Sequence, residues 1–146
     1  DPTNINLLNE WYFKTIHHEF THIFTQTKEY TSDFQLISGT SYVGDAWNDY
    51  WSSDADAQKA GFVSQYASKE ANEDFAENVC IYLTQSSKQW DAMLTGAGTA
   101  GAEIIKQKFE VVYNYMKDSW NIDLNQLRDI VQRRSSEIDK LDLENF

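Results

Sequence analysis

Proline is almost absent from this chain, and that absence limits the folds open to it. It occurs once, at position 2, and the whole chain has only six glycines. Because both residue types interrupt regular structure, their scarcity favours long helices over a turn-rich β-sandwich. Several stretches carry apolar residues at helical spacing, and none alternates convincingly as a strand does. We therefore expect a mainly α-helical fold with little or no sheet.

The length and charge of the chain limit its number of domains and the partners it can bind. A chain of 146 residues, 41% of them apolar, suits one folded domain with a substantial core. We expect a single domain over residues 1–146, either as a whole protein or as the C-terminal portion of a longer one. A net charge of −11 would repel phosphate backbones, which argues against nucleic-acid partners. No run of 18 apolar residues occurs, so we expect no membrane-spanning segment.

Five segments carry the helical pattern, and one long segment does not. In the first helix, Ile16, Phe20, Ile23 and Phe24 fall on one side and are expected to face the core. Asp54 is expected to cap a short helix through Lys59. Residues 31–53 have no clear hydrophobic period and are expected to form a long loop. Residues 34–37 within it could instead form a short strand. The helices are expected at about 6–30, 68–84, 88–94, 99–120 and from Asp123 onward.

His18, Glu19 and His22 match the pattern H-E-x-x-H in the first predicted helix. Residues i and i+4 lie about 40° apart around a helix axis, so both imidazoles can reach one ion. Neutral imidazole suits Zn²⁺, and Glu19 would lie beside an open coordination position where a carboxylate can accept a proton from water. The two histidines fall on the side opposite the apolar residues. The competing interpretation is a surface helix with a coincidental histidine pair.

The zinc site needs at least one further ligand, and a carboxylate is the remaining candidate. The chain has three histidines within six residues, and His17 points about 100° away from the pair, so we expect it to pack or to support a ligand. A single cysteine, Cys80, cannot supply a structural cysteine set and is expected to be a buried, unreactive thiol. Glu73 and Glu77 share one face of the helix at 68–84. One of them could bind zinc and the other could orient an imidazole, unless both lie on a solvated acidic face.

The combination of H-E-F-T-H at residues 18–22 and N-E-D-F-A-E at residues 72–77 resembles the gluzincin branch of zinc metallopeptidases. The resemblance implies that Glu73 is the third zinc ligand and that Glu77 orients a ligating histidine. Several members of that branch have a tyrosine seven residues before the ligand, which supports the oxyanion, and Tyr66 has this spacing. These motifs cover about residues 17–83.

The H-H-E-F-T-H context and the aromatic, Asn- and Asp-rich texture also resemble zinc-metallopeptidase lipoproteins found near outer-membrane nutrient-import systems of Bacteroidetes. That resemblance implies an extracytoplasmic protein of the bacterial cell envelope with a lipid anchor upstream. Zincins usually carry a sheet before the active-site helix, but only 17 residues precede His18 here. Either an upstream portion supplies the substrate-binding strand, or residues 31–53 line the cleft instead.

The function expected from these patterns is zinc-dependent hydrolysis of peptide or related amide bonds. His18, His22 and Glu73 would hold Zn²⁺, and Glu19 would act as the general base on a peptide or protein substrate. The alternative is a non-catalytic, zinc-scaffolded binding module at the cell surface, although such a module would not need Glu19. A third possibility is a helical scaffold without metal.

Overall fold

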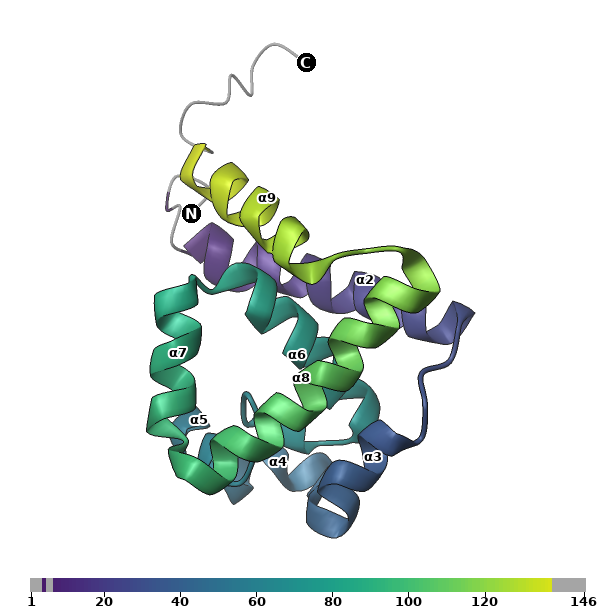
Figure 1. Ribbon diagram of the computed structural model, residues 1–146. Coiled ribbons are helices and arrows are strands. Elements are labelled where there is room, and N and C mark those ends of the chain that lie inside the picture. The colour runs from purple at the N-terminus through teal and green to yellow at the C-terminus, as the bar shows by residue number, and fades with distance from the viewer. Residues whose placement is uncertain (1–3, 5–6, 138–146) are drawn as a thin grey trace.

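The computed structural model describes residue 4 and residues 7–137, and all regular structure in this part of the chain is helical (Figure 1). The predicted mainly α fold is thus confirmed. No described helix is both long enough and apolar enough to cross a membrane. The elements are a π-helical turn η1 (Leu8–Phe13), α2 (Lys14–Thr27), α3 (Asp33–Ser38), η2 (Gly39–Ser41), η3 (Gly44–Ala46), α4 (Trp47–Tyr50), α5 (Asp54–Lys59), η4 (Tyr66–Ser68), α6 (Ala71–Thr84), α7 (Ser87–Gly96), α8 (Gly98–Trp120) and α9 (Leu124–Glu137).

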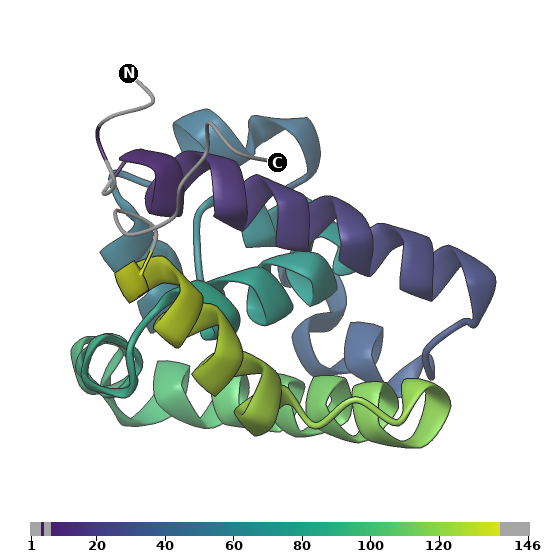
Figure 2. The ribbon, with the colours of Figure 1, turned by 90° about the horizontal axis from the view of Figure 1, so that it is seen from above.

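Helix α6 forms the centre of the molecule. Viewed from above, it lies between α2 on one side and α8 with α9 on the other (Figure 2). Every residue from 74 to 83 is buried, so neither face of α6 is the solvated acidic face that the sequence left open. Its C-terminal end is closed by α9, where Gln132 donates to the Leu83 carbonyl and Arg128 to the Gln85 carbonyl, each at 2.9 Å. These side chains bind carbonyls that the end of a helix would otherwise leave without partners.

The predicted core face of α2 is wrong. Ile16 is 36% exposed, Phe20 54% and Ile23 55%, and only Phe24 packs inward, with its ring 4.8 Å from that of Trp120. The buried residues of α2 are His18 and Thr21, on the side that packs against α6. Polar side chains can be buried here because α6 supplies hydrogen-bonding partners. An apolar stripe therefore did not identify the face that this fold buries.

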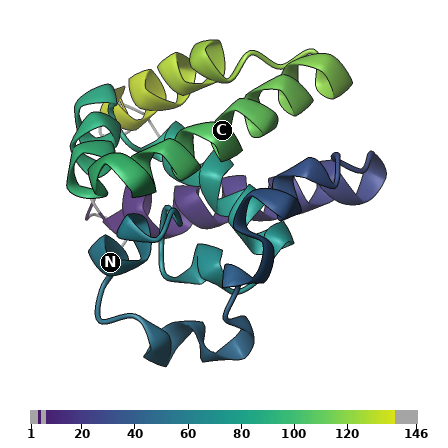
Figure 3. The same ribbon diagram turned by 60° about the horizontal axis from the view of Figure 1, so that its bottom comes forward.

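Residues 31–53 form short helices in place of the predicted loop, and residues 34–37 are helical, not a strand. Figure 3 shows the short helices between residues 33 and 59 along one edge of the molecule. Phe34 is fully buried, with its ring 5.0 Å from Phe75 and 5.7 Å from Tyr30. These turns depend on contacts with distant residues, which a local periodicity cannot reveal.

The remaining helix limits agree with prediction within a few residues, apart from one cap. Ser53, not Asp54, caps α5 by accepting from the backbone N–H of Asp56, while Asp54 accepts from the Gln65 backbone at 2.7 Å. Helix α9 begins where predicted, and Asp123 caps it by accepting from the N–H groups of Asn125 and Gln126. Helices α5 and α8 touch at Gly101, where a Cβ would overlap the backbone carbonyl of Gln58.

A buried ion pair joins α6 to α8. The Lys108 ammonium lies 2.6 Å from the Asp74 carboxylate, and both side chains are fully buried. Lys108 also donates to the Gly61 carbonyl at 2.8 Å and lies 3.9 Å from the centre of the Phe62 ring. Burial raises the pKa of Asp74 and lowers that of Lys108, and their mutual attraction opposes both shifts. Asp74 directly follows Glu73, so this pair fixes the first turn of α6.

Candidate metal centre

Helix α2 presents two imidazoles to α6 one turn apart. His18 is 7% exposed, and His22 is half-buried. Their Nε2 atoms lie 3.0 Å apart and the ring centroids 4.7 Å apart. This closeness follows from the i, i+4 spacing on one helix face, as the sequence predicts. His17, one residue away, is half-buried, and burial lowers its pKa.

Glu73 completes a three-membered group from the first turn of α6. Its Oε2 atom lies 3.0 Å from His18 Nε2 and 3.1 Å from His22 Nε2. Burial opposes ionisation of Glu73, but hydrogen bonds from Tyr66 and the two histidines outweigh it and lower the pKa of the carboxyl. An ionised oxygen therefore faces two ring nitrogens across the α2–α6 contact.

The three atoms have the spacing of a metal site. Zinc bonds of about 2.0–2.1 Å at tetrahedral angles place neighbouring ligand atoms about 3.3 Å apart. The atoms of His18, His22 and Glu73 are 3.0–3.1 Å apart, and these residues form one of two groups in the described chain with metal-binding geometry. Two nitrogens and one carboxylate oxygen are ligand types that zinc takes in catalytic sites. The donor set therefore fits zinc.

Glu77 determines how His18 presents its nitrogens. Its Oε1 lies 3.0 Å from His18 Nδ1, and because a carboxylate only accepts, Nδ1 carries the hydrogen. The neutral ring then directs the lone pair of Nε2 towards Glu73 and His22. Burial opposes the charge on His18, yet Glu77 and Glu73 raise its pKa. Without a cation, a proton on Nε2 would satisfy the facing lone pairs, and a bound metal would take its place.

Two further side chains hold Glu77 in its ionised form. Ser64 donates to Glu77 Oε2 at 2.6 Å, and the Lys14 ammonium lies 3.0 Å from the same oxygen. Burial alone would raise the pKa of Glu77, but the hydrogen bonds from His18 and Ser64 and the charge of Lys14 lower it to about 2. Sequence reasoning missed both partners. Lys14 lies four residues before His18 on the same helix face, a spacing that could have revealed it, whereas Ser64 lies in an irregular segment without such a signal.

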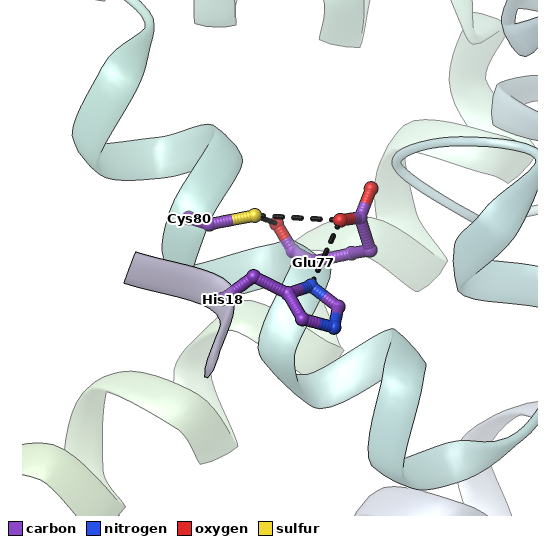
Figure 4. Close-up of side chains that lie close together, drawn as sticks. All are labelled: His18, Glu77 and Cys80. Atoms are coloured by element: carbon purple, nitrogen blue, oxygen red, sulfur yellow. Dashed lines mark hydrogen bonds and ion pairs between the residues drawn. The ribbon is translucent and has the colours of Figure 1, made fainter. Parts of the chain in front are cut away.

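The second group with metal-binding geometry is His18, Glu77 and Cys80 (Figure 4). The Cys80 sulfur lies 3.4 Å from Glu77 Oε1, on the side of His18 that carries Nδ1. Cys80 is fully buried, and burial beside Glu77 raises the pKa of its thiol well above the usual value. Because zinc binds the thiolate, a thiol held protonated makes this group the weaker candidate. Cys80 is the buried free thiol that the sequence predicts.

An open cleft of about 350 Å³ lies beside His18. Its walls include Trp11, Lys14, His18, Glu19, Tyr66 and Glu77. Glu19 is exposed, and the Tyr66 ring centroid is 5.7 Å from that of His18. Burial and a hydrogen bond to Glu73 raise the pKa of Tyr66, so its hydroxyl stays protonated. The structure thus brings all six predicted site residues to one place.

The segment at residues 31–53 contributes to a second hollow, which lies beside His22. Ser32 and Gln35 line it together with His22 and Asn72. Trp47, from the same segment, packs its ring edge-on against Tyr66 at 5.0 Å. This segment therefore lines the hollow beside His22 and packs on Tyr66, but none of its residues lines the cleft beside His18, as one of the two predicted arrangements would require.

The sequence model of a family described as "Putative zinc-binding metallo-peptidase" matches residues 1–125, which include the whole site. The chain belongs to this family. Among solved structures, the chain is similar to one titled a putative zinc-binding metallo-peptidase from Bacteroides caccae ATCC 43185, with 43% identity and a TM-score of 0.92. The match covers 99% of this chain and 55% of that one, so this chain spans about half the length of its relative. A search of curated proteins found no match.

Proposed function

We propose that this protein is a zinc-dependent metallopeptidase of the gluzincin type, with Zn²⁺ held by His18, His22 and Glu73. The observation that carries the proposal is the convergence of Nε2, Nε2 and Oε2 within 3.1 Å of one another beside an open cleft. Membership of a family described as zinc-binding metallopeptidases supports it. A scaffold without metal would need a proton between these facing lone pairs, whereas one zinc ion would bind all three ligand atoms.

Glu19 is the proposed general base. When bound, zinc would polarise the scissile carbonyl and lower the pKa of a water molecule in the cleft. Glu19 lies on the wall of that cleft and is exposed, so its carboxylate can accept the proton from water and pass it to the leaving amine. A purely structural zinc site would not need an ionisable group at this position, which separates a peptidase from a zinc-scaffolded binding module.

Tyr66 is the proposed donor to the developing oxyanion. Its hydroxyl stays protonated because burial and Glu73 raise its pKa, so it can donate where a hydroxylate could not. Glu77 is proposed to keep His18 in the tautomer that offers Nε2 to the metal. Both roles follow the resemblance to gluzincins, and the position of each side chain supports them.

Cell-envelope location is a separate part of the proposal. It rests on the resemblance to Bacteroidetes lipoproteins, and the similarity to a Bacteroides protein is compatible with it. Fractionation of cells that express the native gene would find the protein with the outer membrane. Recovery in the soluble cytoplasmic fraction would contradict this part alone.

The test of the proposed function compares wild type with Glu19→Gln on a broad peptide library after zinc loading. Glutamine keeps the size and hydrogen bonding of glutamate but cannot accept the proton. We expect both proteins to hold zinc and the variant to lose about 10²–10⁴-fold in rate. Loss of zinc from the variant would make Glu19 structural. Equal rates in both proteins would remove it as the base, and absence of any cleavage by the wild type would favour the binding module.

A further inference from the structure

An apolar stripe runs along the outer face of the first helical segment. It consists of Leu7, Tyr12, Ile16, Phe20 and Ile23, whose exposed fractions range from 36% for Ile16 to 61% for Tyr12. From Tyr12 onward the spacing is four, four and three residues, so the side chains lie on one helix face. The opposite face of the same helix buries His18 and Thr21 against α6. The first helical segment therefore has two faces suited to burial. The described residues bury only the face that packs against α6.

The stripe is unusual for the surface of a folded protein. In the part of the chain that the structure describes, nine large hydrophobic side chains are exposed, and five of them belong to the stripe. A sixth, Trp11, lies on the same segment but lines the cleft. Single exposed apolar residues need no explanation, whereas a contiguous row of them marks an interaction surface.

The relative from Bacteroides caccae contains further polypeptide beyond the part that matches this chain. Its matched part reproduces 99% of this chain with a TM-score of 0.92, while the remaining 45% of the relative has no counterpart here. We infer that the stripe is the docking face for a further polypeptide segment of the kind that makes up this remaining part. The inference concerns the outer face of α2 and does not depend on zinc or on catalysis.

Charge argues against the other possible occupants. A second copy would bring together two chains of net charge −11 each, which disfavours self-association. An anionic lipid surface would need free cations beside the stripe. The two lysines near it are engaged elsewhere, since Lys14 pairs with Glu77 and Lys28 lies 4.2 Å from the centre of the Trp120 ring.

Hydroxyl-radical footprinting read by mass spectrometry tests the inference on two proteins, this chain and the Bacteroides relative. Oxidation of Tyr12, Phe20 and Ile23 should be fast in this chain, close to the rate at exposed Leu36 and well above that at buried Phe34. At the aligned positions of the relative, after correction for residue type, oxidation should be several-fold slower and approach the buried reference. Fast oxidation in both proteins would overturn the inference.

Companion measurements on this chain identify the competing occupants. Sedimentation across a range of concentrations would reveal a dimer, and repeating the footprint with vesicles of zwitterionic or anionic lipid would reveal a membrane surface. Protection of the stripe in the monomer without vesicles would mean that the chain covers it with its own residues. Any of these three results would overturn the proposed occupant.

Phe20→Ser and Ile23→Ser should leave the unfolding midpoint of this chain unchanged, because neither side chain contributes to its core.

Discussion

His18 is the residue on which the proposed chemistry depends, because both of its ring nitrogens are engaged. Nδ1 lies 3.0 Å from Glu77 and Nε2 lies 3.0 Å from Glu73, so the ring joins the proposed metal position to a buried carboxylate. Two residues missed from the sequence, Lys14 and Ser64, hold that carboxylate in place. The orientation of the proposed ligand is thus fixed by two successive shells of side chains, first Glu77 and then Lys14 with Ser64.

Replacing Glu77 by Gln should weaken zinc binding about 10–100-fold, the usual effect of removing a partner of a ligating histidine. A competition titration with a chromophoric chelator measures the dissociation constant. Glu70→Gln is the matched control, since Glu70 is exposed and directly precedes the same helix. Equal affinities in the two variants would show that Glu77 does not orient His18.

Cys80 should be unreactive in the folded protein. It is fully buried and its raised pKa keeps it protonated, whereas only the thiolate attacks disulfide reagents. A thiol-specific reagent should label the native protein only as fast as the fold opens, and label the urea-unfolded protein at once. Rapid labelling of the native protein would contradict the buried position and would restore Cys80 as a candidate ligand.

At the scale of elements, α6 carries Glu73 and Glu77 and is buried from residue 74 to residue 83. The Asp74–Lys108 pair ties its first turn to α8. A helix that positions a ligand in its first turn needs such a tie, because helix ends otherwise fray.

Lys108→Met should destabilise the protein by about 3–5 kcal/mol, because it leaves the Asp74 charge buried without a partner. Adding Asp74→Asn to this variant should recover part of the loss by removing that charge. Urea unfolding followed by circular dichroism measures both. A loss below about 1 kcal/mol for Lys108→Met alone would contradict the role of the pair.

Much of the helical layout was predictable from sequence, and the exceptions have physical causes. The limits of α6, α7 and α8 follow from local periodicity, and the histidine pair follows from helix geometry. The turns at residues 33–50 were not predictable, because they form around distant rings such as Phe75 packed on Phe34. The inward face of α2 was predicted wrongly, because the carboxylates that bind His18 across that face lie on α6, more than 50 residues away in sequence.

At the scale of the whole molecule, the proposed zinc site is a cross-link between α2 and α6. It joins residues 51 and 55 positions apart in sequence, at a contact that otherwise includes the Lys14–Glu77 ion pair. Any ligand that binds only the folded state stabilises it, and here the stabilisation acts directly between two long helices.

Zinc at about 100 times its dissociation constant should stabilise the fold by about 2.7 kcal/mol. For a chain of this size, that corresponds to a rise in melting temperature of about 5–10 °C. Differential scanning calorimetry with zinc and with EDTA measures the shift. The same shift in a His22→Ala variant would show that zinc acts somewhere other than the α2–α6 contact.

Zinc K-edge X-ray absorption of the metal-loaded protein tests the central claim most directly, because nitrogen, oxygen and sulfur ligands differ in bond length. Ligation by His18, His22 and Glu73 predicts nitrogen and oxygen neighbours at about 2.0–2.1 Å, imidazole scattering from two rings and no sulfur. A sulfur neighbour at about 2.3 Å would place the metal between His18, Glu77 and Cys80 instead and would contradict the account.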